Sequence, residues 1–238
     1  MCKRLDCVLV ETGAAQSRER AKELIKAGHV AVNGQICAKP STLISAGDET
    51  AVTGGTLEYV GRGGLKLAYA LERFGISVDG LVCLDVGAST GGFTDCMLKN
   101  GAKKVYALDV GHSQLAEKLR ADSRVINMEK TDIRGINSFD DVEFVGADVS
   151  FISLKLVLPS IFEAFGGGTA VVLVKPQFET GRKFLNKKGI VKDGEAARQT
   201  LEEITEFAET LGFTVAGSCE SPLKGGSGNT EFLLILKK

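Results

Sequence analysis

The sequence predicts a doubly wound α/β domain over residues 65–238, preceded by a small α+β module over 1–58 and a linker at 59–64. Three observations support the α/β domain. Strand-like and helix-like segments alternate from Leu81 onward. A glycine-bearing loop follows the first of these strands, and the connection before the last strand is too short for a helical crossover. These features predict a mostly parallel sheet of seven strands, with the last one antiparallel.

The N-terminal module is expected to hold two helices and a hairpin. An apolar helical face opens at Leu5, and Ser17 is a good N-cap for a second helix that Gly28 would close. Asn33-Gly34 lies between two short β-like segments, which is a strong hairpin signal. A further strand is expected at 50–52.

In the larger domain, a helix is expected first, because leucines recur at helical spacing after the glycines of the linker. The alternation then begins. The strands are predicted at 81–86, 104–110, 123–128, 143–148, 169–175, 213–219 and 231–236, and the helices at about 92–99, 113–120, 153–165 and 195–211.

Composition excludes several protein classes. The chain has 238 residues, of which 44% are hydrophobic and 25% charged, as in a folded globular protein. No apolar run approaches the roughly 20 residues of a membrane helix, and the N-terminus lacks the apolar core of a signal peptide. The six cysteines are scattered without a Cys-x-x-Cys pair, so we expect free thiols in a reducing cytoplasm and no metal site.

The stretch 82–95 predicts a cofactor site. An apolar run ends in Asp85, and the glycine loop that follows has the spacing Gly-x-x-x-Gly-Gly. The Gly-x-Gly-x-x-Gly pattern that cradles a pyrophosphate is absent, so S-adenosyl-L-methionine fits better than NAD. Gly87 and Gly91 are expected to let the ligand approach the backbone; a glycine-rich turn without a ligand is the alternative. The residues predicted to bind the cofactor here are Asp85, Gly87, Ala88, Ser89, Thr90, Gly91, Gly92 and Phe93.

Two further carboxylates follow neighbouring strands. Asp109 comes about 20 positions after the glycine loop, where an acidic residue accepts hydrogen bonds from ribose hydroxyls. Asp132 follows the next strand and is expected on the adenine side. Asp109 with Val110, and Asp132 with Ile133, therefore join the predicted cofactor site. Solvated carboxylates at strand ends are the alternative.

Four charged residues are predicted to meet at the edge where the parallel strands end. Asp148 and Lys175 close adjacent strands, and a lysine at that position is costly to bury unless it is paired. Glu231 begins the reversed strand and therefore lies at the same edge. Lys66, on the helix before the sheet, can reach in from above. An ion pair without a catalytic role is the alternative.

Net charge is −1, so any RNA-binding surface must be local. From Met1 to Lys39 there are seven basic residues and four acidic ones, which suits phosphate contacts, although a solvated helix face is the alternative. A second cationic stretch, 181–192, is expected either to hold the RNA backbone or to be a mobile surface loop. The residues predicted to contact RNA are Lys3, Arg4, Arg18, Arg20, Lys22, Lys26, Asn33, Arg62, Arg182, Lys183, Lys187 and Lys188.

These motifs resemble known families. The run from Arg4-Leu5-Asp6 through Ser17-Arg18 to Asn33-Gly34 resembles the S4 RNA-binding module. The stretch from Asp85 to Asp95 resembles the FtsJ/RrmJ-type ribose 2′-O-methyltransferases. Along nearly its full length the chain resembles the TlyA family. Two further stretches support this resemblance, Arg62-Gly63-Gly64-Leu65-Lys66-Leu67 and Ala147-Asp148-Val149-Ser150-Phe151. The residues Lys66, Asp148, Lys175 and Glu231 also match a Lys-Asp-Lys-Glu tetrad in the expected order.

The resemblance implies an S-adenosyl-L-methionine-dependent enzyme that methylates a cytidine ribose in ribosomal RNA, with the large subunit favoured because the chain looks like the shorter TlyA type. Lys175 is then expected to attract or take the hydroxyl proton, with Asp148 orienting it. Lys66 and Glu231 would position the ribose. The implied partner is ribosomal RNA or a ribosomal subunit, without a membrane or a metal.

Two alternatives remain open. The family is often labelled hemolysin A, which suggests a pore-forming cytolysin. The other alternative is an S4-type RNA-binding protein whose methyltransferase domain is inactive. The chain also departs from the family pattern at Gly61, where a serine is expected, and this departure predicts a more flexible linker.

Overall fold

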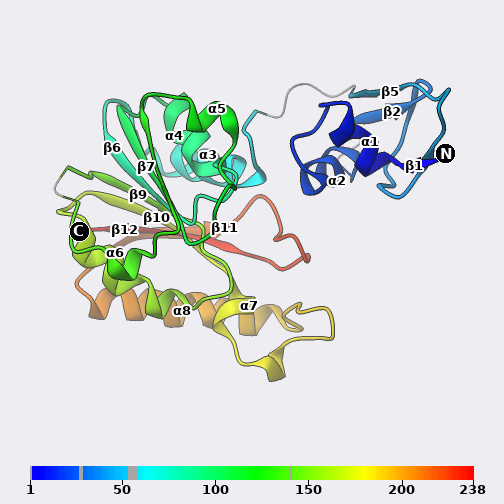
Figure 1. The fold of residues 1–238 in the computed structure, drawn as a ribbon. Helices are drawn as coiled ribbons and strands as arrows, with labels where there is room; N and C mark the ends of the chain where they lie inside the picture. The colour runs from blue at the N-terminus through cyan, green and yellow to red at the C-terminus, as the bar shows by residue number, and fades with distance from the viewer. Residues whose placement is uncertain (1, 27–28, 53–57, 140) are drawn as a thin grey trace. The chain divides into compact units, whose positions relative to one another are not determined.

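The computed structural model describes residues 2–26, 29–52, 58–139 and 141–238. The chain divides into two compact units, Met1–Glu58 and Tyr59–Lys238 (Figure 1). Gly28, the predicted end of the second helix, lies outside the described residues.

The first unit packs two helices against short antiparallel strands. Its elements are β1 (Lys3–Arg4), α1 (Leu5–Glu11), α2 (Arg18–Lys26), β2 (Val30–Val32), β3 (Gln35–Ile36), β4 (Leu43–Ile44) and β5 (Thr50–Val52). β2 pairs with β3 and β5, while β1 pairs with β4. Ser17 caps α2 by accepting the backbone N–H of Arg20 at 3.2 Å. Asn33 and Gly34 have φ angles of 49° and 77°, as the predicted two-residue turn requires.

The second unit is built on a seven-stranded sheet. Its strands are β6 (Val82–Val86), β7 (Lys104–Asp109), β8 (Val125–Glu129), β9 (Phe144–Ala147), β10 (Thr169–Val174), β11 (Thr214–Glu220) and β12 (Phe232–Lys237). Their order is β11-β12-β10-β9-β6-β7-β8. The five strands from β10 to β8 are parallel, and β12 runs antiparallel to both of its neighbours. The predicted sheet with a reversed last strand is confirmed.

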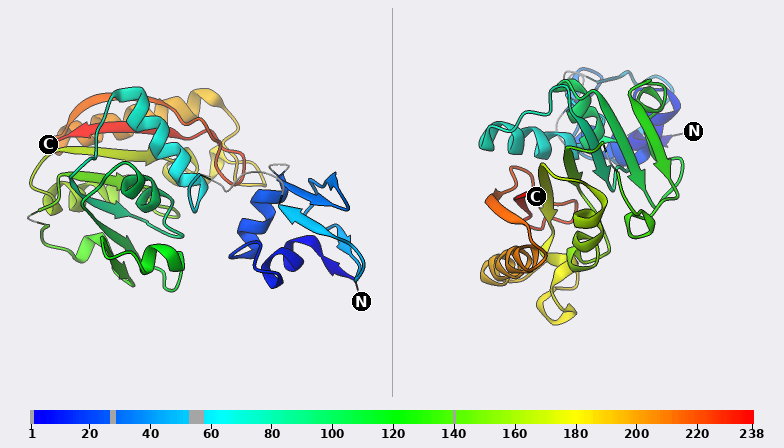
Figure 2. Two further views of the ribbon diagram at one scale, coloured as in Figure 1. Left: turned by 90° about the horizontal axis from the view of Figure 1, so that it is seen from above. Right: turned by 90° about the vertical axis from the view of Figure 1, so that its left-hand side faces the viewer.

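Helices cover both faces of this sheet (Figure 1 and Figure 2). The longer ones are α3 (Arg62–Phe74), α4 (Gly92–Lys99), α6 (Leu158–Ala164) and α8 (Gly194–Thr210), and the shorter ones are α5 (Glu117–Arg120), α7 (Pro176–Glu179), η1 (Ile133–Gly135), η2 (Leu154–Leu156) and η3 (Arg182–Phe184). One core cluster contains apolar residues of α3, α4 and α5, and the other contains those of α6 and α8. Neighbouring strand residues such as Cys83 and Leu84 belong to opposite clusters, because side chains alternate along a strand.

Two predicted helices are shorter than expected, for local reasons. The helix predicted at 113–120 begins only at Glu117, because Ser113 has φ of 53°, which a right-handed helix does not allow. The helix predicted at 153–165 is divided into η2 and α6. Pro159 cannot donate a backbone hydrogen bond within a helix, so it lies in the first turn of α6.

The linker prediction also needs correction. α3 begins at Arg62, so the helix includes residues that were expected in the linker. Residues 59–61 belong to the second unit, where the ring of Tyr59 is buried in the core cluster of α3 and α4. All six cysteines are free thiols.

Candidate active site

Strand register brings three of the four tetrad residues, Asp148, Lys175 and Glu231, to one edge of the sheet. In the pairing of β10 with β12, Val174 lies opposite Phe232, so the next residues outward are Lys175 and Glu231. In the pairing of β9 with β10, Ala147 lies opposite Val172, so Asp148 follows at the same edge. The reversal of β12 is what brings its first residues to the edge where the parallel strands end.

The four side chains form two ion pairs. Lys175 Nζ lies 2.5 Å from Asp148 Oδ1 and donates to the hydroxyl of Ser150 at 2.8 Å. Lys66 Nζ donates to Glu231 Oε2 at 2.5 Å. Both lysines and Glu231 are buried, and Asp148 is partly exposed. Each buried cation therefore has a carboxylate partner, which is the condition under which such burial is tolerated.

Helix α3 can approach this edge of the sheet closely because Gly63 and Gly64 have no side chains. A Cβ atom at Gly63 would lie 3.3 Å from Asp148 Oδ2 and 3.3 Å from the ring of Phe93. At Gly64 it would lie within 3 Å of Tyr59 and of the carbonyl oxygen of Gly92. The glycines of Arg62-Gly63-Gly64 thus allow the helix to approach closely enough to bring Lys66 to Glu231.

Asp85 lies beneath the glycine loop and is fully buried. Its Oδ2 accepts hydrogen bonds from the backbone N–H of Thr94 at 2.8 Å and from the Thr94 hydroxyl at 2.6 Å, while Oδ1 has no partner. Burial raises the pKa of Asp85 to about 7, against the opposing effect of the two hydrogen bonds from Thr94. An unpartnered buried carboxylate oxygen is expensive, and a polar ligand would satisfy it.

The two loop glycines are also required by the backbone and by packing within the protein. Gly87 and Gly91 adopt φ angles of 85° and 95°. A Cβ atom at Gly87 would lie 2.9 Å from the carbonyl oxygen of Asp148, and one at Gly91 would lie 2.2 Å from a methyl carbon of Leu119. Backbone conformation and protein packing therefore require glycine at both positions.

The other predicted cofactor residues divide into two groups. Phe93 and Ile133 are core side chains, and Ala88 is also buried, whereas Val110 is exposed. Ser89 and Thr90 are exposed on the loop. The side chains of Ser89, Thr90 and Val110 therefore reach solvent, whereas those of Phe93 and Ile133 lie in the core on the apolar faces of α4 and η1.

The carboxylates of Asp109 and Asp132 are both engaged. Asp109 accepts the backbone N–H of Ser89 at 2.8 Å and that of Gly111 at 2.7 Å, which joins the glycine loop to the loop after β7. Asp132 accepts hydrogen bonds from the backbone and the guanidinium of Arg134. These hydrogen bonds lower the pKa of Asp132.

The residues before α3 pack against the glycine loop. The backbone N–H of Val60 donates to Asp95 Oδ2 at 2.8 Å, and a Cβ atom at Gly61 would lie 2.9 Å from the hydroxyl oxygen of Thr90. Residues 60 and 61 therefore have defined contacts with the rest of the second unit, and the more flexible linker expected from Gly61 stays a prediction. Glycine is favoured at position 61 because a side chain would collide with Thr90.

Sequence reasoning missed an aromatic group beside the tetrad. Phe151 is 91% exposed, has φ of 65°, and packs against Phe178 with ring centroids 5.0 Å apart. Its loop is held by Glu179, which accepts the Ser153 hydroxyl at 2.5 Å and the backbone N–H of Leu154 at 2.8 Å. Burial raises the pKa of Glu179.

Gln177 was missed as well. Its Nε2 donates to Glu231 Oε1 at 3.3 Å, and its Oε1 is buried without a partner. The signal for these residues was adjacency, since Ser150 and Phe151 follow Asp148, and Gln177 follows Lys175.

Most predicted RNA contacts in the first unit are ion-paired. Asp6 is buried and pairs with Arg4 at 2.9 Å and Arg18 at 3.2 Å. The hydrogen bond from Arg4 holds the pKa of Asp6 well below its usual range. The side chains of Arg4 and Arg18 remain about half exposed although both are paired with Asp6. Three further basic residues have acidic partners: Lys3 with Glu11, Arg20 with Glu23, and Lys22 with Glu19.

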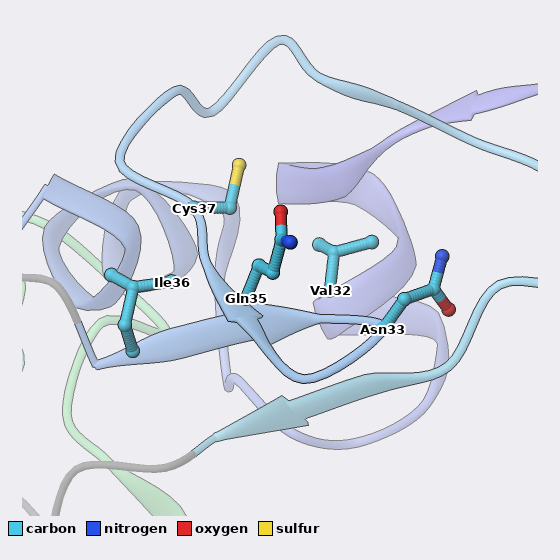
Figure 3. Close-up of a pocket in the computed structure, with 5 residues that line it drawn as sticks. All are labelled: Val32, Asn33, Gln35, Ile36 and Cys37. Atoms are coloured by element: carbon cyan, nitrogen blue, oxygen red, sulfur yellow. The ribbon is translucent and has the colours of Figure 1, made fainter.

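A hollow on the first unit lies over the β2–β3 hairpin. It is lined by Val32, Asn33, Gln35, Ile36 and Cys37 (Figure 3). The Asn33 side chain donates to Asp48 at 2.8 Å and accepts the backbone N–H of Glu49 at 2.9 Å, so its amide stabilises the turn. The tetrad residues belong to the other unit.

The described residues show neither a membrane-crossing helix nor a cluster of metal-binding side chains. None of the helices there combines the length and the apolar content needed to cross a membrane. In the same part of the chain, no group of three or more histidine, cysteine, aspartate or glutamate side chains is arranged to hold a metal ion.

Comparison with known proteins agrees with this architecture. The FtsJ-like methyltransferase family matches residues 59–238, and the S4 domain matches residues 3–49. The chain is 44% identical to the 16S/23S rRNA (cytidine-2′-O)-methyltransferase TlyA of Mycobacterium tuberculosis, over 98% of this chain and 89% of that protein. It is 43% identical to hemolysin A of Brachyspira hyodysenteriae, over 97% and 98% of the two chains.

Solved structures give the same result. A protein of Streptococcus thermophilus that is named as a candidate hemolysin superposes with a TM-score of 0.78, at 45% identity, over 100% of this chain and 88% of that one. An S-adenosylmethionine-dependent methyltransferase of Mesorhizobium loti, at 14% identity, shares the fold with a TM-score of 0.55 over 71% of this chain and 96% of that one. The chain therefore belongs to the TlyA family, with an S4 domain followed by an FtsJ-like methyltransferase domain.

Proposed function

We propose that this protein transfers a methyl group from S-adenosyl-L-methionine to the ribose 2′-hydroxyl of a cytidine in ribosomal RNA. The observation that carries the proposal is the pair of buried lysine–carboxylate contacts, Lys175 with Asp148 and Lys66 with Glu231, at the end of the parallel strands. Ligands of open α/β sheets bind at this edge. The cytidine and the ribosomal RNA are those named for the TlyA relatives.

The residues around the glycine loop fit the cofactor. The unpartnered Oδ1 of Asp85 and the exposed Ser89 and Thr90 offer polar atoms beneath and along the loop. Asp109 retains acceptor capacity for ribose hydroxyls, since each carboxylate oxygen can accept a second hydrogen bond. When bound, the cofactor supplies an electrophilic methyl group on a positively charged sulfur.

We assign Lys175 as the base that takes the proton of the ribose hydroxyl. A ribose hydroxyl is a weak nucleophile while it holds its proton, so a base must take that proton as the new oxygen–carbon bond forms. Lys175 takes it in the neutral amine form, after its ammonium group has released one proton to solvent. Asp148 and Ser150 fix Nζ in position from two sides. Lys66 and Glu231 orient the ribose, with Gln177 holding the second oxygen of Glu231. Alignment of this kind supplies much of the rate increase.

Phe151 is proposed as the platform for the target base. An exposed aromatic ring held against a second ring by a clamped loop suits stacking with a nucleobase. The first unit would bring the RNA, because the S4 match covers its basic helix and because the side chains of Arg4 and Arg18 stay about half exposed. Such a substrate implies a cytoplasmic protein.

The large ribosomal subunit is the favoured substrate. The Campylobacter jejuni relative, 39% identical over 73% of this chain and 69% of that protein, is named for 23S rRNA alone, whereas the Mycobacterium tuberculosis relative is named for both RNAs. Cytolysis is the other candidate, and it rests on the hemolysin names of relatives. Release of dye from phospholipid vesicles by the purified protein would support it.

The test is transfer of radiolabelled methyl from S-adenosyl-L-methionine to purified ribosomal subunits that lack the modification. Wild-type protein and Lys175→Ala are compared on small and large subunits. We expect label in large-subunit RNA with the wild type, and a rate lower by at least about 100-fold with Lys175→Ala. Cofactor affinity, measured by calorimetry, should be unchanged in the variant.

Either of two results would reject the proposal. One is that wild-type protein binds the cofactor but labels neither subunit, which would favour a binding role or another RNA. The other is that Lys175→Ala transfers methyl at the wild-type rate, which would remove Lys175 from the mechanism.

A further inference from the structure

The cationic segment 181–192 forms a hydrogen-bonded hairpin. It begins with η3, and Leu185 and Val191 then pair in an antiparallel bridge. Asn186 organises the tip, because its Oδ1 accepts the backbone N–H groups of Lys188 at 2.8 Å and Ile190 at 3.1 Å. The cations of the segment are therefore presented on a defined backbone.

The charges of this hairpin are unopposed. The segment contains no acidic residue, and its five basic side chains, Arg182, Lys183, Lys187, Lys188 and Lys192, are all exposed. None of the five forms a salt bridge within the described part of the chain. The basic residues of the first unit differ, since most have an acidic partner. Unpaired like charges repel each other, and an anionic partner would offset that repulsion.

Asn229 attaches the hairpin to the loop that leads into the active site. Its side chain is 2% exposed, and both ends of the amide bind hairpin backbone. Oδ1 accepts the N–H of Val191 at 2.9 Å, and Nδ2 donates to the carbonyl of Gly189 at 3.0 Å. The same residue lies two positions before Glu231, and the hairpin and this loop lie side by side (Figure 2).

We propose that the hairpin 181–192 is a docking arm for the sugar–phosphate backbone of the substrate RNA, and that Asn229 is the positioning residue that holds this arm in place relative to Glu231. The inference rests on the proposed function and extends it to a second RNA-binding surface. Because Glu231 pairs with Lys66, an arm held by Asn229 delivers the RNA strand to the tetrad at a set distance.

RNA suits this surface better than an acidic protein. Phe184 is partly exposed among the cations, with Lys183 Nζ 5.0 Å from the centre of its ring. Interleaved cations and an exposed aromatic ring are typical of surfaces that bind single-stranded nucleic acid, where phosphates pair with the charges and a base stacks on the ring.

The first experiment neutralises two charges at the tip. Binding of Lys187→Gln/Lys188→Gln to ribosomal RNA is measured over a range of salt concentrations. Loss of two phosphate contacts should reduce the slope of log K against log salt by about 1.4, taking about 0.7 for each single-strand contact. In the methyl-transfer assay KM for RNA should rise and kcat should stay within about twofold. A matched control is Lys103→Gln/Lys237→Gln, which removes two exposed lysines at the opposite edge of the sheet.

The second experiment separates position from charge. Asn229→Ala keeps all five cations but removes both hydrogen bonds to the hairpin. We expect faster amide hydrogen exchange at Val191, a higher KM for RNA, and a salt slope equal to that of the wild type. Asn229→Asp, which keeps the acceptor but loses the donor to Gly189, should have an intermediate KM. Melting temperature and cofactor affinity are measured in both variants to exclude general unfolding.

The outcomes can be told apart. If the wild type methylates RNA, and Lys187→Gln/Lys188→Gln has the same salt slope and KM as the opposite-edge control, then the proposed docking arm is wrong and the proposed function stands. If Asn229→Ala exchanges faster at Val191 with an unchanged KM, the positioning role of Asn229 is wrong. If polyglutamate competes with RNA for the hairpin at equal charge concentration, the assignment to RNA is wrong. Failure of the wild type to methylate any ribosomal RNA rejects the proposed function, and the salt-slope measurement still tests the arm.

Discussion

Lys66 and Glu231 lie 165 positions apart in the chain, yet the lysine Nζ donates to the carboxylate at 2.5 Å. The two residues are 6% and 3% exposed. The contact joins the helix that precedes the sheet to the strand that ends it, at the edge where Asp148 and Lys175 also meet. An ion pair this deeply buried costs desolvation energy, which suggests a role beyond stability.

This pair predicts a non-additive effect on stability. Lys66→Met leaves Glu231 buried without its cation and should lower the free energy of unfolding by about 3–5 kcal/mol. Lys66→Met/Glu231→Leu removes both charges and should recover most of that loss, while methyl transfer stays abolished in both variants. Urea unfolding and the transfer assay measure the two effects. A double variant as unstable as the sum of the single ones would show that the pair is not coupled.

The exposed ring of Phe151 predicts a loss of activity with little loss of stability. Phe151→Ala should slow methyl transfer by roughly 10- to 100-fold, since base–aromatic stacking contributes about 1–3 kcal/mol. The free energy of unfolding should fall by less than about 1.5 kcal/mol, because only the contact with Phe178 is lost. Phe151→Trp should retain most activity. Leu156→Ala, also an exposed apolar residue, is the control, and an equal loss in that variant would contradict a stacking role.

Asp85 predicts a dependence of stability on pH. Burial raises its pKa in the folded protein to about 7, well above that of an unfolded aspartate. Between these two values the folded state binds the proton more tightly than the unfolded state, so this carboxyl makes folding less favourable as pH rises from about 4 to about 7. Above pH 7 its effect is constant.

Asp85→Asn removes this titration and keeps an acceptor for Thr94. The stability of Asp85→Asn relative to the wild type should therefore increase from pH 4 to pH 7, by an amount on the order of a few kcal/mol. Chemical denaturation of both proteins without cofactor across this range is the measurement. A constant difference would mean that Asp85 titrates normally.

The sequence predicted those elements correctly whose backbone conformation depends on a few neighbouring residues. The apolar run of β6, the Asn33-Gly34 turn and the cap at Ser17 all depend on residues a few positions apart, and all were predicted. The failures are also local in origin. Ser113 adopts a positive φ and Pro159 lies in a first turn, and each shortens a helix that apolar spacing alone had extended.

Side-chain roles were harder to predict. Phe93 and Ile133 were predicted to bind the cofactor, but their apolar side chains face the core. Gln177, Ser150 and Asn229 acquire their roles from partners that are distant in sequence. A pattern of residue types does not indicate which of two faces a side chain takes, since that depends on what packs against it.

The sequence by itself determined the alternation of strands and helices, the reversed last strand, and the presence of charged residues where Asp148, Lys175 and Glu231 stand. Only the tertiary structure decided that Asp148 pairs with Lys175, that Glu231 pairs with Lys66, and that Asn229 holds the cationic hairpin. The physical reason is that hydrophobic periodicity and turn residues act over a few positions. The pairing of buried polar groups depends on strand register and helix approach across the whole domain.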